Sequence, residues 1–563
     1  MNLLKTITYF LSPRLGRIIS AMQTNAIVNS RWSKSPCPPF SKEGSIHAAT
    51  RKTYRLWEKD YQAIDQISQS DLTAIKILRT FPLFQRELGG FQLLKLAKSP
   101  KVICKNIPSR CVFIILTILW VSCQSKTENQ QALTTETNTT QISDDSLFNL
   151  VQYRTFQYFW NGAEPNSGMA AERIHLDGIN PQNDQHIVTI GGSGFGVMAI
   201  LVGIERGYIS REEGRERLQQ IVNFLEAADR FHGAWPHWLD GKTGKVKPFS
   251  RKDDGGDLVE TAFMIQGLLA VRQYFAQGNQ AELALAEQID RLWQEVEWDW
   301  YTQGKNVLYW HWSPNFDWEM NFPVGGYNEC LIMYVLAAAS PTHPISPEVY
   351  HQGWARNGDI RSEETFYGYD LVLDHYEHND DPVGPLFWAH YSYLGLNPRN
   401  LKDQYGNYWK LNQNHALTHL EYCKENPKNY AGYGENCWGL TSSYSMRGYV
   451  GHRPGQDLGV ISPTAALSSF PYTPEPSMAA MRYFYDSLGD RIWGEYGFYD
   501  AFSQTRGYYP PRYLAIDQGP VVVMMENHRS GLLWDLFMSY PEVQQGLEKL
   551  GFEHTENSQS SAG

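Results

Sequence analysis

The chain of 563 residues is long enough for one large domain or several smaller ones. Its charge is uneven, because residues 1–122 hold 18 Lys and Arg against 6 Asp and Glu, whereas the rest holds 31 against 54. So acidic a body excludes nucleic acid as a partner. Aromatic residues make up 13% of the chain, with 18 Trp and 33 Tyr. Such side chains stack on sugar rings through an apolar face, although an ordinary core also uses them.

The seven cysteines form no CxxC pair and show no metal-ligand spacing. Three of them lie in the acidic body, so at most one disulfide can form there. Cys423 and Cys437 are the favoured pair, because Cys330 lies in an apolar helical run. A disulfide framework is therefore excluded as the source of stability.

An apolar segment from Cys111 to Cys123 follows the basic residues Lys101, Lys105 and Arg110. A basic region, a short apolar run and a cysteine form the pattern of a bacterial lipoprotein signal. The run is too short to span a membrane, which takes about 20 apolar residues. The sequence predicts a signal peptide at 101–123, lipidation of Cys123 and a polar tether at 124–144. The protein is then expected to be exported and lipid-anchored, at the outer membrane or the periplasmic face.

The first hundred residues precede this signal, where an exported protein should have none. We expect residues 1–100 to be a non-native extension or disordered, with translation beginning near residue 101. Peptides from residues 30–90 in the mature protein, found by mass spectrometry, would contradict this. Residues 554–563 are expected to be a disordered tail.

From residue 145 onward the apolar periodicity is helical almost throughout. Helices are predicted at 195–207, 210–230, 257–276, 280–295, 325–340, 345–356, 381–394, 411–424, 474–487 and 530–550. About a dozen helices with little strand signal predict an all-α fold at 145–553. The expected architecture is an (α/α)6 toroid or barrel with long aromatic-rich loops at its cleft end. A globular helix bundle without a cleft is the alternative.

Four carboxylates lie within eight residues at Asp253, Asp254, Asp257 and Glu260, just before an apolar run. If the segment is helical, all of them except Asp254 fall on one face at i, i+4 and i+7. Such a group needs a bound partner or separated pKa values to offset its repulsion. The structural alternative is a helix cap, with Asp257 as N-cap and Glu260 completing a capping box.

A second acidic point repeats this design at Glu329, which follows Gly325-Gly326 and begins an apolar helix. Partial burial there should raise its pKa, as a general acid working near neutral pH requires. The alternative is a first-turn Glu stabilised by the helix dipole.

Loops rich in Trp and Tyr accompany both acidic points, and the chain contains no GxSxG or HExxH motif. Carboxylates mixed with aromatic platforms, without a cofactor motif, are typical of a carbohydrate hydrolase cleft. No cofactor and no metal are expected, since the loops carrying His232, His237 and His311 lack tetrahedral ligand spacing. The predicted substrate-binding residues are Asp254, Trp235, His311, Trp312, Trp388, Trp438, Tyr499 and Asp517.

Six motifs in order resemble the glucoamylase-like domain of glycoside hydrolase family 144. They are DDGGDLVET (253–261), HWSP (311–314), YNECL (327–331), WGLT (438–441), SPTAALSSFPYTP (462–474) and YDAF (499–502). The resemblance covers about residues 145–553 and implies an (α/α)6 barrel that cleaves β-1,2-glucan with inversion and without a metal. Where many relatives continue WGLT with Ala-Ser-Asp, this chain has Ser442-Ser443-Tyr444, which leaves subsite preference and endo or exo action open.

Carried over by position, the family's acidic cleft residues match Asp253, Asp257, Glu260 and Glu329. Glu329 resembles the general acid, and the other three are expected to hold the sugar and activate water; whether Asp517 is the base stays open. The predicted protein is a monomeric exported glycoside hydrolase acting on a β-glucan polysaccharide or oligosaccharide, with the membrane reached through its lipid anchor alone. The alternatives are a hydrolase of another glucan linkage on the same fold and a non-catalytic surface glycan-binding lipoprotein.

Overall fold

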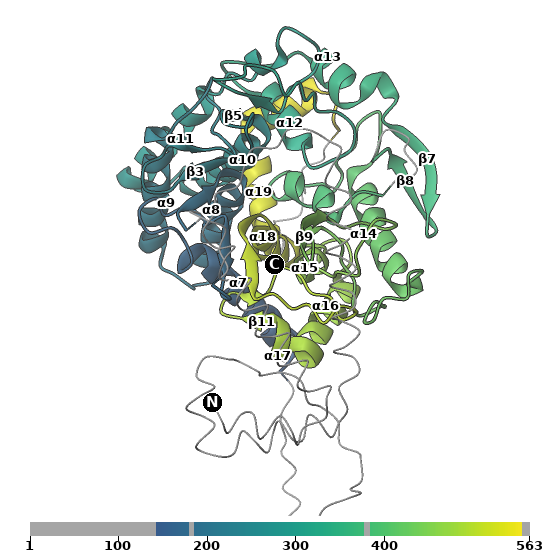
Figure 1. Cartoon of the computed structure of the whole chain (residues 1–563). Helices are drawn as coiled ribbons and strands as arrows, with labels where there is room; N and C mark the ends of the chain where they lie inside the picture. Colours follow the sequence, from purple (N-terminus) through teal and green to yellow (C-terminus); the bar gives the residue numbers. More distant parts are fainter. Residues whose placement is uncertain (1–141, 179–184, 376–382, 554–563) are drawn as a thin grey trace, which may run out of the picture. The chain divides into compact units, whose positions relative to one another are not determined.

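Helices dominate the described part of the computed structural model, which comprises residues 142–178, 185–375 and 383–553 (Figure 1). The longer helices are α7 (Asp144–Trp160), α8 (Ile190–Glu205), α9 (Arg211–Ala227), α10 (Leu258–Phe275), α11 (Gln280–Gln294), α14 (Tyr408–Glu425) and α18 (Ala515–Arg529). The shorter ones are α12 (Leu331–Ala339), α13 (Pro347–Val349), α15 (Pro463–Ser468), α16 (Pro474–Arg482), α17 (Leu488–Ile492), α19 (Leu532–Met538) and α20 (Pro541–Lys549).

The helices form an inner ring covered by outer helices. In the ring α18 contacts α8, α8 contacts α10, α10 contacts α12, and α15 closes back on α18. Between α12 and α15 the ring is completed by short helical turns at 386–393, where His390 bonds Ser469 at 3.0 Å. Outside it, α9 covers α8, α11 covers α10, α20 covers α12, α16 covers α15 and α7 packs on α18 and α8. This pairing is the predicted α/α arrangement.

The inner helices are apolar on all sides, because other helices surround them. Every residue of α12 is buried, and almost every residue of α8 and α10. Helices α8 and α10 approach so closely that a Cβ on Gly194 would lie 2.4 Å from the Phe263 carbonyl oxygen. Glycine at this point therefore allows the two inner helices to touch through their backbones.

The strands are short and antiparallel, and they lie in the connections between helices. Strands β2 (Ile187–Thr189), β3 (Trp238–Asp240) and β4 (Val246–Lys247) form one sheet. Five pairs complete the set: β1 (Arg173–His175) with β13 (Arg512–Leu514), β5 (Gly256–Asp257) with β6 (His311–Trp312), β7 (Arg361–Phe366) with β8 (Tyr369–Leu373), β9 (Ser442–Ser445) with β10 (Gly448–Gly451) and β11 (Trp493–Gly494) with β12 (Gly497–Phe498).

Several predicted helices differ from the observed ones. The helix predicted at 325–340 begins only at Leu331, and the described part of 381–394 forms single 3₁₀ turns. The helix predicted at 530–550 is two helices, since Pro541 starts a new one after Tyr540. Helix α18 is absent from the predicted helices, and Pro520 lies inside it.

The predicted disulfide is wrong, because Cys330, Cys423 and Cys437 are all free and buried. Burial raises the pKa of the Cys423 thiol well above its usual value, and the Cys437 thiol adds to the shift. These cysteines therefore behave as small apolar core residues.

Within the described ranges, no helix is long and apolar enough to cross a membrane. The predictions for residues 1–100, the signal at 101–123, Cys123, most of the tether and the tail at 554–563 fall outside those ranges.

Candidate active site

The acid cluster lies at the N-terminus of inner helix α10. Asp257 is its N-cap, and its Oδ1 accepts hydrogen bonds from the backbone N–H groups of Val259 at 3.0 Å and Glu260 at 2.9 Å. The cap prediction is therefore confirmed. The predicted helical face is wrong, since the helix begins at Leu258, after Asp253 and Asp257.

The predicted capping box does not form. The backbone N–H of Asp257 donates to the Trp235 carbonyl oxygen at 2.9 Å, so it offers nothing to Glu260. Glu260 Oε2 instead accepts from the backbone N–H of Gly191 at 2.8 Å, in the first turn of α8. The Glu260 side chain thus joins the N-termini of two inner helices, where free N–H groups favour negative charge.

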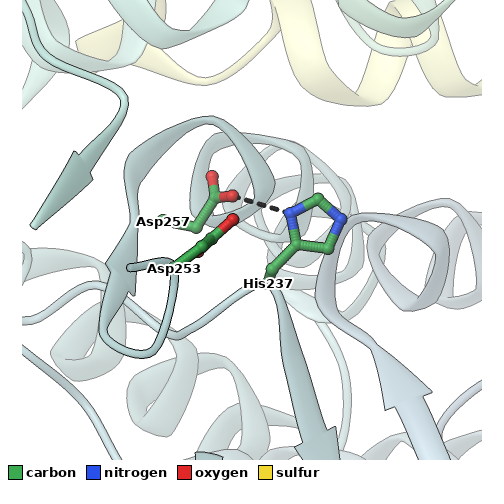
Figure 2. A group of neighbouring side chains, drawn as sticks. All are labelled: His237, Asp253 and Asp257. Carbon is green, nitrogen blue, oxygen red and sulfur yellow. Dashed lines mark hydrogen bonds and ion pairs between the residues drawn. The ribbon is translucent and has the colours of Figure 1, made fainter. Parts of the chain in front are cut away.

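Two histidines converge on the same carboxylates. His237 Nδ1 lies 2.8 Å from Asp257 Oδ2. Figure 2 shows this contact with Asp253 beside it. Strand β6 pairs His311 directly with Asp257 and places His311 Nδ1 3.3 Å from Asp253 Oδ1 and 3.7 Å from Asp257 Oδ2. The indole N–H of Trp310 also donates to Asp257 Oδ2, at 3.1 Å. Both oxygens of Asp257 are therefore fully engaged.

These contacts separate the pKa values of the cluster. Burial alone would raise the pKa of Asp257, but the His237 bond and the charges of His311 and His237 lower it overall. Burial opposes the charge on His237, yet Glu260 and Asp257 raise its pKa to about 10. Burial raises the pKa of Glu260 to about 7, although His237 counteracts it. Asp257 consequently stays ionised at neutral pH, while Glu260 titrates there.

His237, Asp253 and Asp257 could also hold a cation, since one ligand atom from each lies within 4.8 Å of the others. A ligating imidazole must first lose its proton. Glu260 and Asp257 raise the pKa of His237 to about 10, so its imidazole keeps its proton at neutral pH. A metal ion would have to displace that proton. A protonated His237 already offsets the charge of these carboxylates.

Glu329 lies one residue before Cys330, the N-cap of α12, rather than inside the helix as predicted. Burial raises its pKa to about 7, and the charges of Glu260 and Asp257 contribute. The expected pKa shift is thus present, and its source is desolvation together with the acid cluster. The Ser392 hydroxyl donates to the Glu329 carbonyl oxygen and fixes the backbone of this turn.

A second pair of carboxyl groups involves Asp517, in the first turn of α18, and Asp500, after β12. Both are buried, and their side chains hydrogen-bond to each other. Burial and then Asp500 raise the pKa of Asp517 well above its usual value, so the two groups share a proton. The Tyr391 hydroxyl donates to Asp517 Oδ1 at 3.4 Å.

Tyr391 interacts with both acidic groups. Burial raises the pKa of its phenol well above the usual value, followed by the charges of Asp517, Tyr449, Glu329 and Glu260. The carboxyls of Asp517, Glu329 and Glu260 therefore all act on the same phenol. The predicted catalytic residues thus occupy one region, at the N-termini of inner helices α8, α10, α12 and α18.

Two predicted sugar platforms are wrong. Trp235 and Trp438 are fully buried, with their indole N–H groups donating to the carbonyl oxygens of Leu225 and Pro476. They cannot stack on a substrate. Trp388 is only 8% exposed, which leaves little surface for a sugar.

Of the other predicted binding residues, some lie in the site and others pack in neighbouring loops. Asp254 points away from the cluster and bonds Ser313 and Asn315, so it shapes the 313–316 loop. Trp312 and Tyr499 are half-buried among other aromatic rings. His311 and Asp517 lie in the site, as described above.

Sequence reasoning missed four residues of the site: His237, Tyr391, Tyr449 and Asp500. In the sequence His237 has the side chain of a metal ligand without the ligand spacing, and Asp500 lies within the YDAF motif. Their roles depend on β3, β10 and the loop after β12, which the helical periodicity could not predict.

Comparison with known proteins places these features in a family. Residues 321–541 match the family model described as putative glucoamylase. An endo-β-1,2-glucanase from Chitinophaga pinensis, solved with sophorotriose and glucose, is 67% identical over 73% of this chain and 99% of that chain, with a TM-score of 0.72. The chain belongs to the glucoamylase-like enzymes of glycoside hydrolase family 144. Its fold is the α/α barrel of these enzymes.

Two further relatives are similar to this chain over much of its length. A putative glucoamylase from Bacteroides caccae is 62% identical over 73% of this chain and all of that chain, with a TM-score of 0.72. An exo-β-1,2-glucooligosaccharide sophorohydrolase from Parabacteroides distasonis is 46% identical over 75% of this chain. The chain spans 60% of the length of that curated relative.

Proposed function

We propose that this chain hydrolyses β-1,2-glucosidic bonds in a glucan or its oligosaccharides. The observation that carries the proposal is Glu329, whose pKa of about 7 suits a general acid and is raised in part by Glu260 and the histidine-paired carboxylate of Asp257. The relatives named for β-1,2-glucan support the linkage.

In the proposed reaction, Glu329 transfers its proton to the oxygen of the departing sugar. A water molecule attacks the anomeric carbon from the opposite face, which inverts the configuration. The protein must then hold a base across the sugar from Glu329, with the two carboxyl groups about 6.5–9.5 Å apart.

Asp517, paired with Asp500, is the proposed acceptor of the water proton. The pKa of Asp500 is raised only to about 6, so Asp500 is ionised near neutral pH and can take the Asp517 proton as Asp517 receives the proton of water. Asp257 is less suited, because four hydrogen bonds engage its two oxygens. We assign Asp253 and Glu260 to holding the sugar next to the cleaved bond, and Asp257 to holding His237 and His311 in place.

A panel of glucans tests the function. Purified protein is incubated with linear β-1,2-glucan, β-1,3-glucan, β-1,4-glucan and α-1,4-glucan, and the products are separated by length. We expect cleavage of β-1,2-glucan alone, with product lengths reporting endo or exo action. Cleavage of a different glucan would favour another linkage on the same fold, and binding without cleavage would favour a glycan-binding protein.

We also propose that the enzyme is exported, lipid-anchored and monomeric. The segment before Cys123 supports the anchor through its basic region, short apolar run and cysteine. Incorporation of a labelled fatty acid that is lost in Cys123→Ser tests it, and labelling that persists in that variant would contradict it.

A further inference from the structure

Three large aromatic rings beside the site are exposed to solvent. Phe249 and Phe322 are each 51% exposed, and Tyr449 is 55% exposed. Exposed aromatic surface is unfavourable in water and marks a binding function when it adjoins a site. In the described ranges the remaining exposed aromatic is Tyr153, 40% exposed on outer helix α7.

Phe249 is fixed onto the acid cluster. Its backbone N–H donates to the Asp253 carbonyl oxygen at 3.0 Å. Its ring centre lies 4.3 Å from that of His237, the partner of Asp257, and 4.8 Å from that of Trp238. The ring thus contacts His237 and Trp238, while about half of the residue stays exposed.

Phe322 is held against the same carboxylate from another segment. Its ring stacks on Trp310 with centres 5.4 Å apart and an angle of 22° between the planes. The Trp310 backbone N–H donates to the Phe322 carbonyl oxygen at 3.0 Å, and the Trp310 indole bonds Asp257 Oδ2. Phe249 therefore packs on His237 and Phe322 packs on Trp310, and both His237 and Trp310 bond Asp257 Oδ2.

Tyr449 lies beside the other carboxyl pair. It pairs across the β9–β10 hairpin with Tyr444, whose backbone N–H donates to Asp500 Oδ2 at 2.9 Å. The Tyr444 hydroxyl is also bonded to His175 at 2.7 Å, which anchors the hairpin. Asp517 and Asp500 are the charged groups that act most strongly on the Tyr449 phenol.

We propose that Phe249, Phe322 and Tyr449 are sugar-stacking platforms that bind glucosyl units of the glucan on both sides of the cleaved bond. The apolar face of a pyranose ring covers aromatic surface, while its hydroxyl groups stay free for the neighbouring polar side chains. Phe249 and Phe322 serve the Asp257 side and Tyr449 serves the Asp517 side. This assignment rests on the proposed function, because it takes the glucan as the ligand.

Single alanine variants test the platforms. Phe249→Ala, Phe322→Ala and Tyr449→Ala are each expected to lower kcat/KM on long β-1,2-glucan about five- to fifty-fold, the range for losing one buried aromatic contact. The loss should lie mainly in KM, because the rings bind sugar without touching the reacting atoms. Tyr449→Phe should keep most of the activity. Tyr153→Ala, at an exposed ring on outer helix α7, is the matched control and should leave KM unchanged.

Glucan binding is measured in parallel by calorimetry in a Glu329→Gln background, so that the result does not depend on turnover. Weaker binding in the three variants than in the Tyr153→Ala control supports the platforms. Unchanged affinity and unchanged KM in all three would overturn them. If the unaltered enzyme cleaves a different glucan, the proposed linkage fails, and the same variants are measured on that glucan. If it binds no glucan, the platforms are overturned as well.

Discussion

Replacing Glu329 by Gln is expected to lower kcat on β-1,2-glucan by about 10²–10⁴-fold, the usual contribution of a general acid. Gln has nearly the same shape, but it has no proton to give to the departing oxygen. In the unaltered enzyme the pKa of Glu329 is about 7, so activity should fall as pH rises through 7. The variant should lose this basic limb, which is measured as kcat against pH.

Stability provides an independent measurement for the same variant. A glutamate whose pKa rises from 4.5 in the unfolded chain to about 7 in the fold binds its proton more tightly when folded. Its contribution to stability is therefore full below pH 4.5 and is lost as pH rises to 7. Glu329→Gln should accordingly raise Tm at pH 8 and change it little at pH 4.

Glu319→Gln is the matched control, since Glu319 is exposed and pairs with Lys252 on the surface. It should leave kcat and its pH profile unchanged. A Glu329→Gln variant with activity near that of this control would refute the acid assignment.

Replacing Asp257 by Ala is expected to lower the free energy of unfolding by about 3–5 kcal/mol, as removal of one partner from a buried ion pair does. The substitution removes the N-cap of α10 and leaves His237 and His311 without their shared carboxylate. Activity should fall as well, because Glu260 and the two histidines lose their fixed positions. Urea unfolding measures the stability, and the glucan assay measures the activity.

Asp257→Asn separates the cap from the charge, because Asn caps helices as well as Asp does. Burial opposes the charge, but the histidines lower the pKa of Asp257 below 3.8 overall. Glu260 and Asp257 raise the pKa of His237 from 6.5 to about 10. The contribution of Asp257 to stability is present above pH 3.8 and is lost as pH falls. The contribution of His237 to stability is full below pH 6.5 and is lost as pH rises through 10. The stability difference from the unaltered enzyme should therefore be largest between about pH 4 and 6.5.

Asp254→Ala is the control for the Asp257 variants, because Asp254 is only half-buried and bonds the neighbouring 313–316 loop. It should cost about 1 kcal/mol, the value of an ordinary hydrogen bond. Equal losses in Asp254→Ala and Asp257→Ala would contradict the special role of the histidine-paired carboxylate.

The acidic residues could be predicted from the sequence because their signal is local. Glycine, an acid and an apolar run follow one another at both Asp257 and Glu329, and this order places a carboxyl at a buried helix N-terminus. Whether a tryptophan is buried depends on residues that are distant from it in the sequence. Trp235 and Trp438 have the same neighbours in sequence as a sugar platform would have, yet the barrel packs them into its core.

Helix α18 shows a second limit of sequence reasoning. Gly519 and Pro520 indicate a break, but a Cβ on Gly519 would lie 2.4 Å from the Phe195 side chain of α8. Glycine there lets α18 approach the inner ring, and its packing offsets the cost of the proline. The pairing of Asp500 with Asp517 depends on this helix, so the sequence could not predict it.

Inverting hydrolysis of β-1,2-glucan requires Glu329 to act across the sugar from a carboxylate base. Proton NMR of the reducing-end signals in the first minutes of hydrolysis tests this most directly, before mutarotation mixes the anomers. We expect the new reducing ends to appear first as the α-anomer. Initial formation of the β-anomer would contradict the account, since it would require a covalent intermediate and two carboxyl groups about 5–5.5 Å apart.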